Sequence, residues 1–187
     1  MQNIGGLIMK FQWMEKQKEK GEGTGFSDGD IIGFDGYELV TREDDRGYLS
    51  EICRRDWDEV SSLVKNFQQV YLVGNWEKGT IRAYHKHKEL VDFFIIVNGV
   101  ARFVGFDDRP DSATFGYLNT IIASARNLKM ITVPAGVYHG WQSLEENTIL
   151  VSVANNLYMG ENRTEWLDEH RIPYDTFGKH MWEVEYK

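Results

Sequence analysis

The chain has 187 residues, 42% of them hydrophobic, which is enough to bury the core of one domain. Its formal net charge of −8 argues against nucleic acids and anionic membranes as general partners, because few cations are left to neutralise their phosphates. The one cysteine, Cys53, excludes an intrachain disulfide, and no apolar run resembles a membrane helix or a secretion signal, so we expect a cytoplasmic protein.

The first 30 residues are expected to form an arm outside the main domain. Gly21, Gly23 and Gly25 would break any helix that begins earlier in this segment. Strand-like sequence begins at Ile31. We therefore predict an N-terminal arm over residues 1–30 and one domain over residues 31–187.

One helix is predicted over residues 56–67. Apolar side chains recur there with a helical period, and Asp56 is suited to the N-cap position. The apolar positions are Trp57, Val60, Leu63, Val64 and Phe67.

The rest of the domain consists of short strand-like runs separated by turn residues. The predicted strands are 31–34, 37–40, 48–52, 69–73, 80–87, 92–97, 101–106, 118–123, 129–133 and 148–154. Evenly spaced strands of this kind predict an all-β fold, either a double-sheet jelly roll or a barrel. The aromatic tail from Trp166 to Tyr186 is expected to pack on this barrel or across a dimer interface.

Three histidines and one aspartate form the main chemical pattern. His85 and His87 are two residues apart on a predicted strand, so their imidazoles share a face. Asp92 begins the next strand, and His139 follows much later. Three neutral imidazoles and a carboxylate on neighbouring strands can bind a divalent transition metal such as Zn, Fe, Ni or Mn. The alternative is a metal-free site in which one histidine acts as a base and the others donate or accept hydrogen bonds.

These residues resemble the two-part signature of the cupin superfamily, G-x5-H-x-H-x4-E-x6-G followed by P-x-G-x2-H. The matching positions are Gly79, His85, His87, Asp92, Gly99, Pro134, Gly136 and His139. The sequence departs from the signature in having Asp92 instead of glutamate, and Ser143 where many cupins have asparagine. The resemblance implies a cupin double-stranded β-helix.

A longer span, roughly residues 34–175, is similar to the dTDP-4-dehydrorhamnose 3,5-epimerase group of the cupins. Four segments carry this similarity: Asp45-Arg46-Gly47 with Glu51, Arg82 to His85, Asp108 to Gly116, and Pro134 to Trp141. Their shared order and spacing are far more specific than any one of the motifs.

The resemblance implies proton transfer beside the keto group of a sugar nucleotide. Such an enzyme needs a base, a group that stabilises the enolate, and an acid on the opposite face. The family's base falls on His85 and its substrate-contacting arginine on Arg82. Its enolate-stabilising lysine falls on Asp92, and a carboxylate could act there only indirectly, as the ligand of a metal ion.

The family's general acid is a tyrosine late in the barrel, for which Tyr158 is the nearest candidate. Tyr138 is a second candidate, which could also bind the substrate or simply form part of the wall. The family also has an aspartate near its C-terminus that orients the base. No matching motif is evident here, and Asp175 lies in a different context.

The resemblance also implies residues that bind the nucleotide. Arg46 and Glu51 match a family segment that contacts the nucleotide, in some members across a dimer. Arg109 matches another family arginine, and arginine suits a diphosphate because its planar fork bonds two oxygens at once. An Arg109–aspartate ion pair within the turn is the alternative. Gln69 is expected at the mouth of the cavity.

The sequence therefore indicates a homodimeric sugar-nucleotide epimerase or isomerase that acts next to the keto group of a nucleoside-diphosphate 4-keto-6-deoxyhexose. We expect no organic cofactor. Two alternatives stay open. One is a metal-dependent cupin of other chemistry, such as a dioxygenase or a sugar isomerase. The other is a non-catalytic, sugar-binding cupin.

Overall fold

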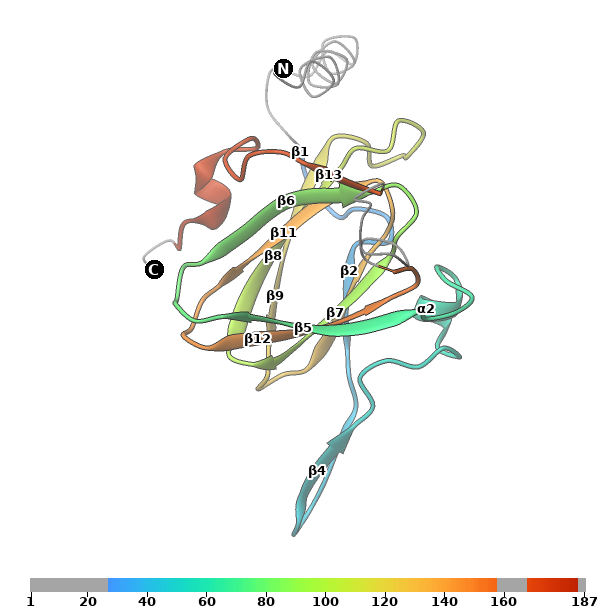
Figure 1. Ribbon diagram of the computed structural model, residues 1–187, viewed down its shortest axis with the longest axis vertical. Coiled ribbons are helices and arrows are strands. Elements are labelled where there is room, and N and C mark those ends of the chain that lie inside the picture. Colours follow the sequence, from blue (N-terminus) through green and yellow to red (C-terminus); the bar gives the residue numbers. More distant parts are fainter. Residues whose placement is uncertain (1–26, 158–167, 185–187) are drawn as a thin grey trace.

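The computed structural model describes residues 27–157 and 168–184 of the chain. In this part the protein is almost entirely β-structure, with two sheets that face each other around a shared core (Figure 1). This architecture confirms the predicted all-β cupin fold. No helix in the described ranges is long and apolar enough to cross a membrane.

Two sheets form the barrel. The six-stranded sheet contains, in spatial order, β1 (Ser27–Asp28), β9 (Tyr117–Ser124), β8 (Val100–Asp107), β11 (Val137–Ser143), β6 (Ile81–His87) and β13 (Glu169–Arg171). The five-stranded sheet contains β2 (Asp35–Glu38), β10 (Lys129–Val133), β7 (Asp92–Asn98), β12 (Thr148–Ala154) and β5 (Gln69–Asn75).

The main core lies between these sheets. Phe94 and Leu150 from the five-stranded sheet pack there against Phe103 and Trp141 from the six-stranded sheet. Because side chains alternate along a strand, these residues define the inner face of each sheet. The residues between them lie on the outer faces.

A two-stranded hairpin projects from the body of the protein (Figure 1). It consists of β3 (Thr41–Asp44) and β4 (Gly47–Ser50). Tyr48 and Leu49 on this hairpin are 71% and 60% exposed. The hairpin therefore presents apolar side chains that no other described part of the chain covers.

The helix predicted over residues 56–67 is largely wrong. Only α2 (Asp58–Ser61) is helical, and its N-cap is Trp57 instead of Asp56. The carboxylate of Asp56 accepts hydrogen bonds from Arg54. The apolar side chains of the segment nevertheless all pack against the outer face of the five-stranded sheet. That surface buries them without a longer helix, and a short helix has little stability of its own.

The first predicted strand is also wrong. Residues 31–34 form a tight turn closed by a bridge between Ile31 and Phe34. Gly33 has φ of +82° there, a conformation that favours glycine and cannot continue a strand. The division at residue 30 stays a prediction, because most of the predicted arm lies outside the described residues.

The aromatic tail packs on the barrel where the structure describes it. Phe177 and Trp182 are buried against Tyr84 and Phe106 on the outer face of the six-stranded sheet. Trp182 belongs to a short 3₁₀ helix, η1 (Lys179–Trp182), and its indole N–H donates a 2.8 Å hydrogen bond to the carbonyl of Tyr174. This packing fixes the segment that follows β13.

Candidate functional site

The three histidines of the sequence motif converge on the inner face of the six-stranded sheet. His85 and His87 lie on β6, and His139 on β11 pairs in register with His85. The ring centroids of His85 and His139 are 4.1 Å apart, and that of His87 is 5.7 and 5.8 Å from them. One ring nitrogen of each lies within 4.8 Å of the others. The predicted convergence is confirmed for these residues.

Asp92 faces the histidines from the five-stranded sheet. It is 1% exposed, and its Oδ2 lies 3.8 Å from Nε2 of both His87 and His139. Its Oδ1 accepts a 3.0 Å hydrogen bond from the hydroxyl of Ser152. Burial raises the pKa of Asp92 to about 7, although hydrogen bonds from Ser152 and Tyr71 act in the opposite direction.

The imidazoles are held in their neutral form. Burial is the main cause that lowers the pKa of each, to about 3 for His139 and well below its usual range for His85. Nδ1 of His139 lies 3.0 Å from the carbonyl oxygen of Val137, so the Nδ1–H donates there and Nε2 carries the lone pair. Nε2 of His139 is buried and has no hydrogen-bond partner among the described residues.

Asp168 is a residue of this site that the sequence analysis missed. Its carboxylate accepts backbone N–H bonds from Lys88, Glu89 and Leu90 at 2.7, 3.0 and 2.9 Å. Its Oδ2 also lies 3.8 Å from Nδ1 of His87. The signal available was the run Asp168-Glu-His-Arg171 before Ile172-Pro173. It is strand-like but short, and its pairing with β6 could not be read from the sequence.

Strand β13 adds two more charged residues to the inner face. Glu169 pairs with His87 and Arg171 pairs with His85, so all four side chains share one side of the sheet. Arg171 Nη2 lies 3.1 Å from Glu169 Oε2. The side chain of Glu169 is 7% exposed, whereas that of Arg171 is 63% exposed. The guanidinium is therefore held at the level of the histidines while it remains accessible to solvent.

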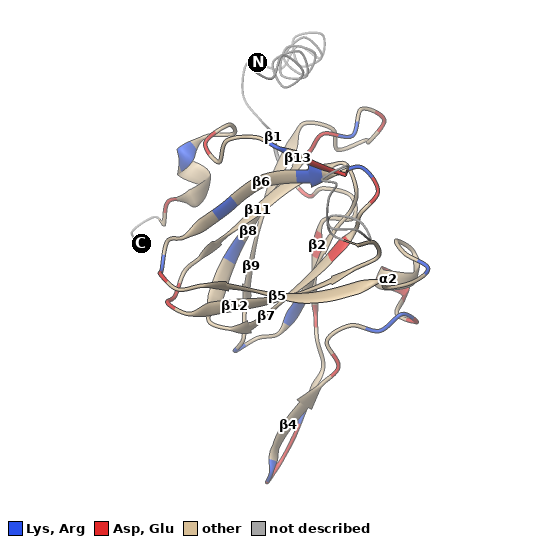
Figure 2. Cartoon of the chain, in the orientation of Figure 1, with Lys and Arg blue, Asp and Glu red and all other residues tan. Residues whose placement is uncertain are grey.

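Arg82 and Gln69 lie at the boundary between the two sheets. Arg82 on β6 donates from Nε to Asn75 Oδ1 at 2.7 Å and from Nη2 to the carbonyl of Gly74 at 3.2 Å, both on β5. Figure 2 shows two basic segments on β6, which are Arg82 and Lys86. Gln69 is level with Asp92, because each pairs with Ala154.

Two residues proposed for substrate binding lie elsewhere. Tyr138 is on the outer face, where its hydroxyl is 2.6 Å from His170 Nδ1 and the ammonium of Lys86 is 4.4 Å from its ring centroid. The reason is strand alternation, since an inward His139 requires an outward Tyr138. The structure therefore places Tyr138 on the opposite face of the sheet from His85, His87 and His139 of its own chain.

Arg109 makes the alternative contact, an ion pair within the turn. Its Nε and Nη2 each lie 2.8 Å from the Asp107 carboxylate, and Nη2 also donates to the carbonyl of Ile32 at 2.7 Å. Tyr158, the proposed general acid, lies outside the described residues.

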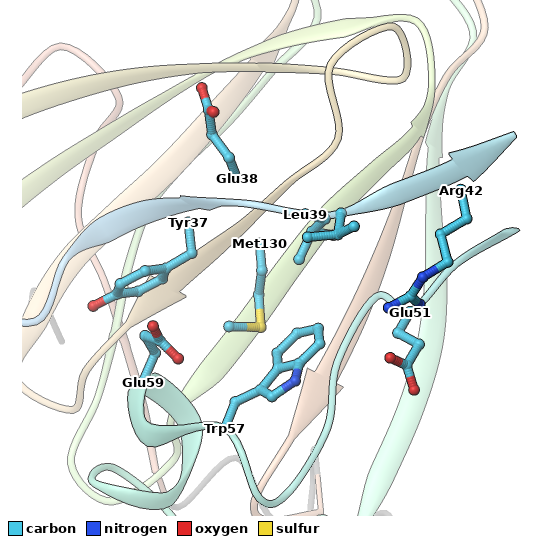
Figure 3. A pocket seen from close by; sticks show the side chains of 9 residues that line it. Tyr37, Glu38, Leu39, Arg42, Glu51, Trp57, Glu59 and Met130 are labelled. Atoms are coloured by element: carbon cyan, nitrogen blue, oxygen red, sulfur yellow. The ribbon is translucent and has the colours of Figure 1, made fainter.

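Arg46 and Glu51 are also separated from the histidines. Arg46 is at the exposed tip of the hairpin, paired with Asp44. Glu51 forms a 2.7 Å ion pair with Arg54 and helps to line a pocket of about 340 Å³ with Trp57 and Met130 (Figure 3). Met130 packs on the outer face of the five-stranded sheet, so this sheet separates the pocket from the histidines.

Comparisons with known proteins agree on one family. The model of the dTDP-4-dehydrorhamnose 3,5-epimerase family matches residues 30–176. A probable low-salt glycan biosynthesis epimerase, Agl13, from Haloferax volcanii is 34% identical over 142 residues, which cover 74% of this chain and 85% of that protein. The spore coat polysaccharide biosynthesis protein SpsL from Bacillus subtilis is 30% identical over 155 residues, which cover 80% and 95%.

Solved structures share the fold. A crystal structure of dTDP-4-dehydrorhamnose 3,5-epimerase from Bacillus anthracis, with TDP and PPi bound, superposes with a TM-score of 0.65 and 26% identity. The match covers 74% of this chain and 77% of that one.

Proposed function

We propose a function from the premise that the chain belongs to the dTDP-4-dehydrorhamnose 3,5-epimerase family. The protein is a sugar-nucleotide epimerase. We propose that it inverts carbons next to the keto group of a nucleoside-diphosphate 4-keto-6-deoxyhexose. The observation that carries the assignment is the convergence of His85, His87 and His139 within the matched span. Its expected cytoplasmic location stays a prediction.

His85 is the proposed base. A keto group acidifies the C–H bonds beside it, and a neutral imidazole can remove one of these protons. The lowered pKa of His85 keeps this imidazole neutral at pH 7. The residue is partly exposed, so a substrate can reach it. The electron pair of the broken C–H bond forms a new C=C bond and the carbonyl π electrons move to the ketone oxygen. Return of a proton to the opposite face then inverts the carbon.

Three further residues have supporting roles in this proposal. Arg82 contacts the substrate from the boundary between the sheets. Asp168 takes the place of the family's C-terminal aspartate, although its carboxylate faces His87 and not His85. Gln69 lines the mouth of the site from β5. Tyr158 remains the proposed acid.

A divalent metal ion is a second proposal for the histidines. The donor set fits, because Nε2 of His139 is buried without a partner while Nδ1 donates to a backbone carbonyl, as is usual for metal-bound histidine. His85, His87 and His139 would hold Zn, Fe, Ni or Mn, with Asp92 beside them. An ion bound there would draw electron density from a carbonyl oxygen.

We also propose a homodimer in which the hairpin of one protomer reaches the site of its partner. The support is that Arg46 and Glu51 lie apart from the histidines of their own chain. The exposed Tyr48 and Leu49 on the same hairpin need a covering surface. Arg109 and Tyr138 keep structural roles in this proposal.

The test is hydrogen exchange in heavy water with a dTDP-4-keto-6-deoxyhexose. The proposed function predicts incorporation of deuterium at C3, at C5 or at both, detected by mass spectrometry and NMR. A protein that binds the sugar nucleotide without any incorporation would instead be a non-catalytic, sugar-binding cupin. Oxygen consumption with bound iron would favour the dioxygenase alternative.

A further inference from the structure

The chemistry proposed for this site creates a negative charge that the sequence motif does not neutralise. Removing a proton beside a ketone leaves an enolate, whose oxygen needs a positive charge or strong hydrogen-bond donors. By the family resemblance, the position of the family's lysine falls on Asp92, which is a buried acid. Asp168 and Glu169 add two more carboxylates close to His87. A cation must therefore come from another position.

Arg171 is a cation at the height of the histidines. It pairs in register with His85, and directly opposed residues in an antiparallel pair have Cβ atoms roughly 5 Å apart on the same face. Its ion pair with Glu169, which is itself in register with His87, holds the guanidinium level with the two imidazoles. Its side chain is 63% exposed, so a ligand can contact it.

Arg82 is less suited to this task. Its Nε and Nη2 already donate to Asn75 and Gly74, at the other end of β5 from Gln69. It precedes His85 by three residues on β6 and lies beyond the bulge where the pairing with β11 shifts. Arg82 is therefore placed to contact a part of the substrate farther from the reacting carbons.

We propose that Arg171 is a catalytic residue whose guanidinium donates hydrogen bonds to the ketone oxygen of the bound sugar and stabilises the enolate formed when His85 removes the neighbouring proton. The proposal rests on the proposed function. No covalent bond to Arg171 forms. The C–H electron pair becomes the new C=C bond, the carbonyl π electrons move to oxygen, and the imidazole keeps the proton until a proton is returned to carbon.

Glu169 is the positioning residue for this group. Its buried carboxylate accepts a hydrogen bond from Arg171 across one strand position and limits where the guanidinium can point. Loss of this carboxylate would remove one of the contacts that position the arginine. Preorganised donors act because they are already aimed at the oxygen before the charge develops.

The experiment compares Arg171→Gln, Arg171→Lys and Glu169→Gln with the wild-type chain. We expect kcat for deuterium exchange to fall about 10²–10³-fold in Arg171→Gln, as when one oxyanion donor is removed. Lysine keeps the charge but not the planar fork, so Arg171→Lys should recover about tenfold of the lost rate. Glu169→Gln should reduce kcat by about tenfold, since the donor is retained but less well placed.

Binding of dTDP, measured by calorimetry, separates this role from a contact with phosphate. This ligand has a diphosphate but no ketone, so its Kd should be unchanged in Arg171→Gln. The matched control is Arg126→Gln, which removes an exposed arginine that pairs with Glu145 at 2.7 Å, and it should leave both quantities unchanged. Melting temperatures show that each variant is folded.

Three results would overturn the inference. The first is wild-type exchange in Arg171→Gln, and the second is a weaker Kd for dTDP with kcat unchanged. The third is exchange that disappears when the protein is treated with EDTA and returns with metal, which would give the electrophilic role to an ion. A wild-type protein that binds dTDP but never exchanges the ketosugar would refute the proposed function itself.

Discussion

The two faces of the six-stranded sheet carry side chains of opposite character at neighbouring positions. On β6, His85 faces the interior of the barrel, whereas Tyr84 faces outward and lies under the aromatic tail. On β11, His139 likewise faces the interior and Tyr138 faces outward. Each strand therefore supports the chemistry with one face and anchors the tail with the other. A substitution on the inner face should mainly reduce activity, whereas one on the outer face should mainly reduce stability.

The largest expected effect is on the inner face. His85→Asn removes the proposed base but keeps a polar side chain of similar size, so exchange should fall about 10²–10⁴-fold. Stability should change little, because His85 is partly exposed and asparagine is also polar. Exchange rates and a urea denaturation curve measured on the same preparation check both statements. Loss of stability without loss of exchange would contradict the view that the inner face serves activity and the outer face serves stability.

The next largest effect is on the outer face. Trp182 is only 4% exposed and its ring contacts that of Tyr84. Trp182→Ala should therefore leave a cavity and destabilise the protein by about 3–5 kcal/mol. Denaturant unfolding measures the loss. Activity should also fall, since the tail that contains Trp182 follows β13, but dTDP should still bind to the protein that remains folded.

Acid should affect the inner face through its histidines. Burial lowers the pKa of His85 and His139 in the folded chain, so the unfolded chain binds more protons below pH 6.5. Stability should therefore decrease as the pH falls from 6.5. Asp92 has the opposite effect on stability, because burial raises its pKa to about 7 in the folded chain. The folded chain therefore binds the proton of Asp92 more tightly than the unfolded chain, and this stabilisation is lost as the pH rises toward 7.

Asp92→Asn separates these opposing contributions. The variant loses the stabilising proton of Asp92 at low pH, so its free energy of unfolding should decrease more steeply than that of the wild type between pH 6.5 and 5. Urea unfolding at several pH values measures both slopes. Equal slopes would show that Asp92 titrates normally in the folded protein.

The smallest effect is expected at Tyr138. Tyr138→Phe removes the 2.6 Å hydrogen bond to His170 on the outer face and should cost about 1 kcal/mol of stability. Exchange should stay at the wild-type rate if Tyr138 has a structural role. A large fall in kcat would instead indicate that Tyr138 contacts the substrate.

The sequence predicted the parts of the site that depend on local spacing. His85 and His87 share a face because strand geometry requires it, and the family motifs located His139 correctly. The helix over residues 56–67 failed because its apolar period is satisfied by the surface of a sheet that only the tertiary structure provides. Local periodicity shows that a side chain is buried, but not always in which kind of element.

Asp168 and Arg171 could not be predicted from the sequence because their place in the site depends on long-range strand pairing. Asp168 and Arg171 join the histidines only because β13 pairs with the edge of β6, about 80 residues earlier in the chain. The three polar residues Glu169, His170 and Arg171 give almost no strand signal, since neither a hydrophobic period nor turn chemistry marks them. The strand β11 was also missed, because Pro134, Gly136 and Gly140 weaken the strand signal around it.

The attachment of β13 to β6 also has a consequence for biosynthesis. During translation, β6, β11 and the strands between them can associate as soon as they have left the ribosome, whereas residues 169–171 emerge about 80 positions after His87. In the nascent chain, the three histidines would therefore be in place before Arg171 pairs opposite His85. Activity would then depend on residues that are translated late, and a ribosome-bound chain that ends before residue 168 should show no exchange.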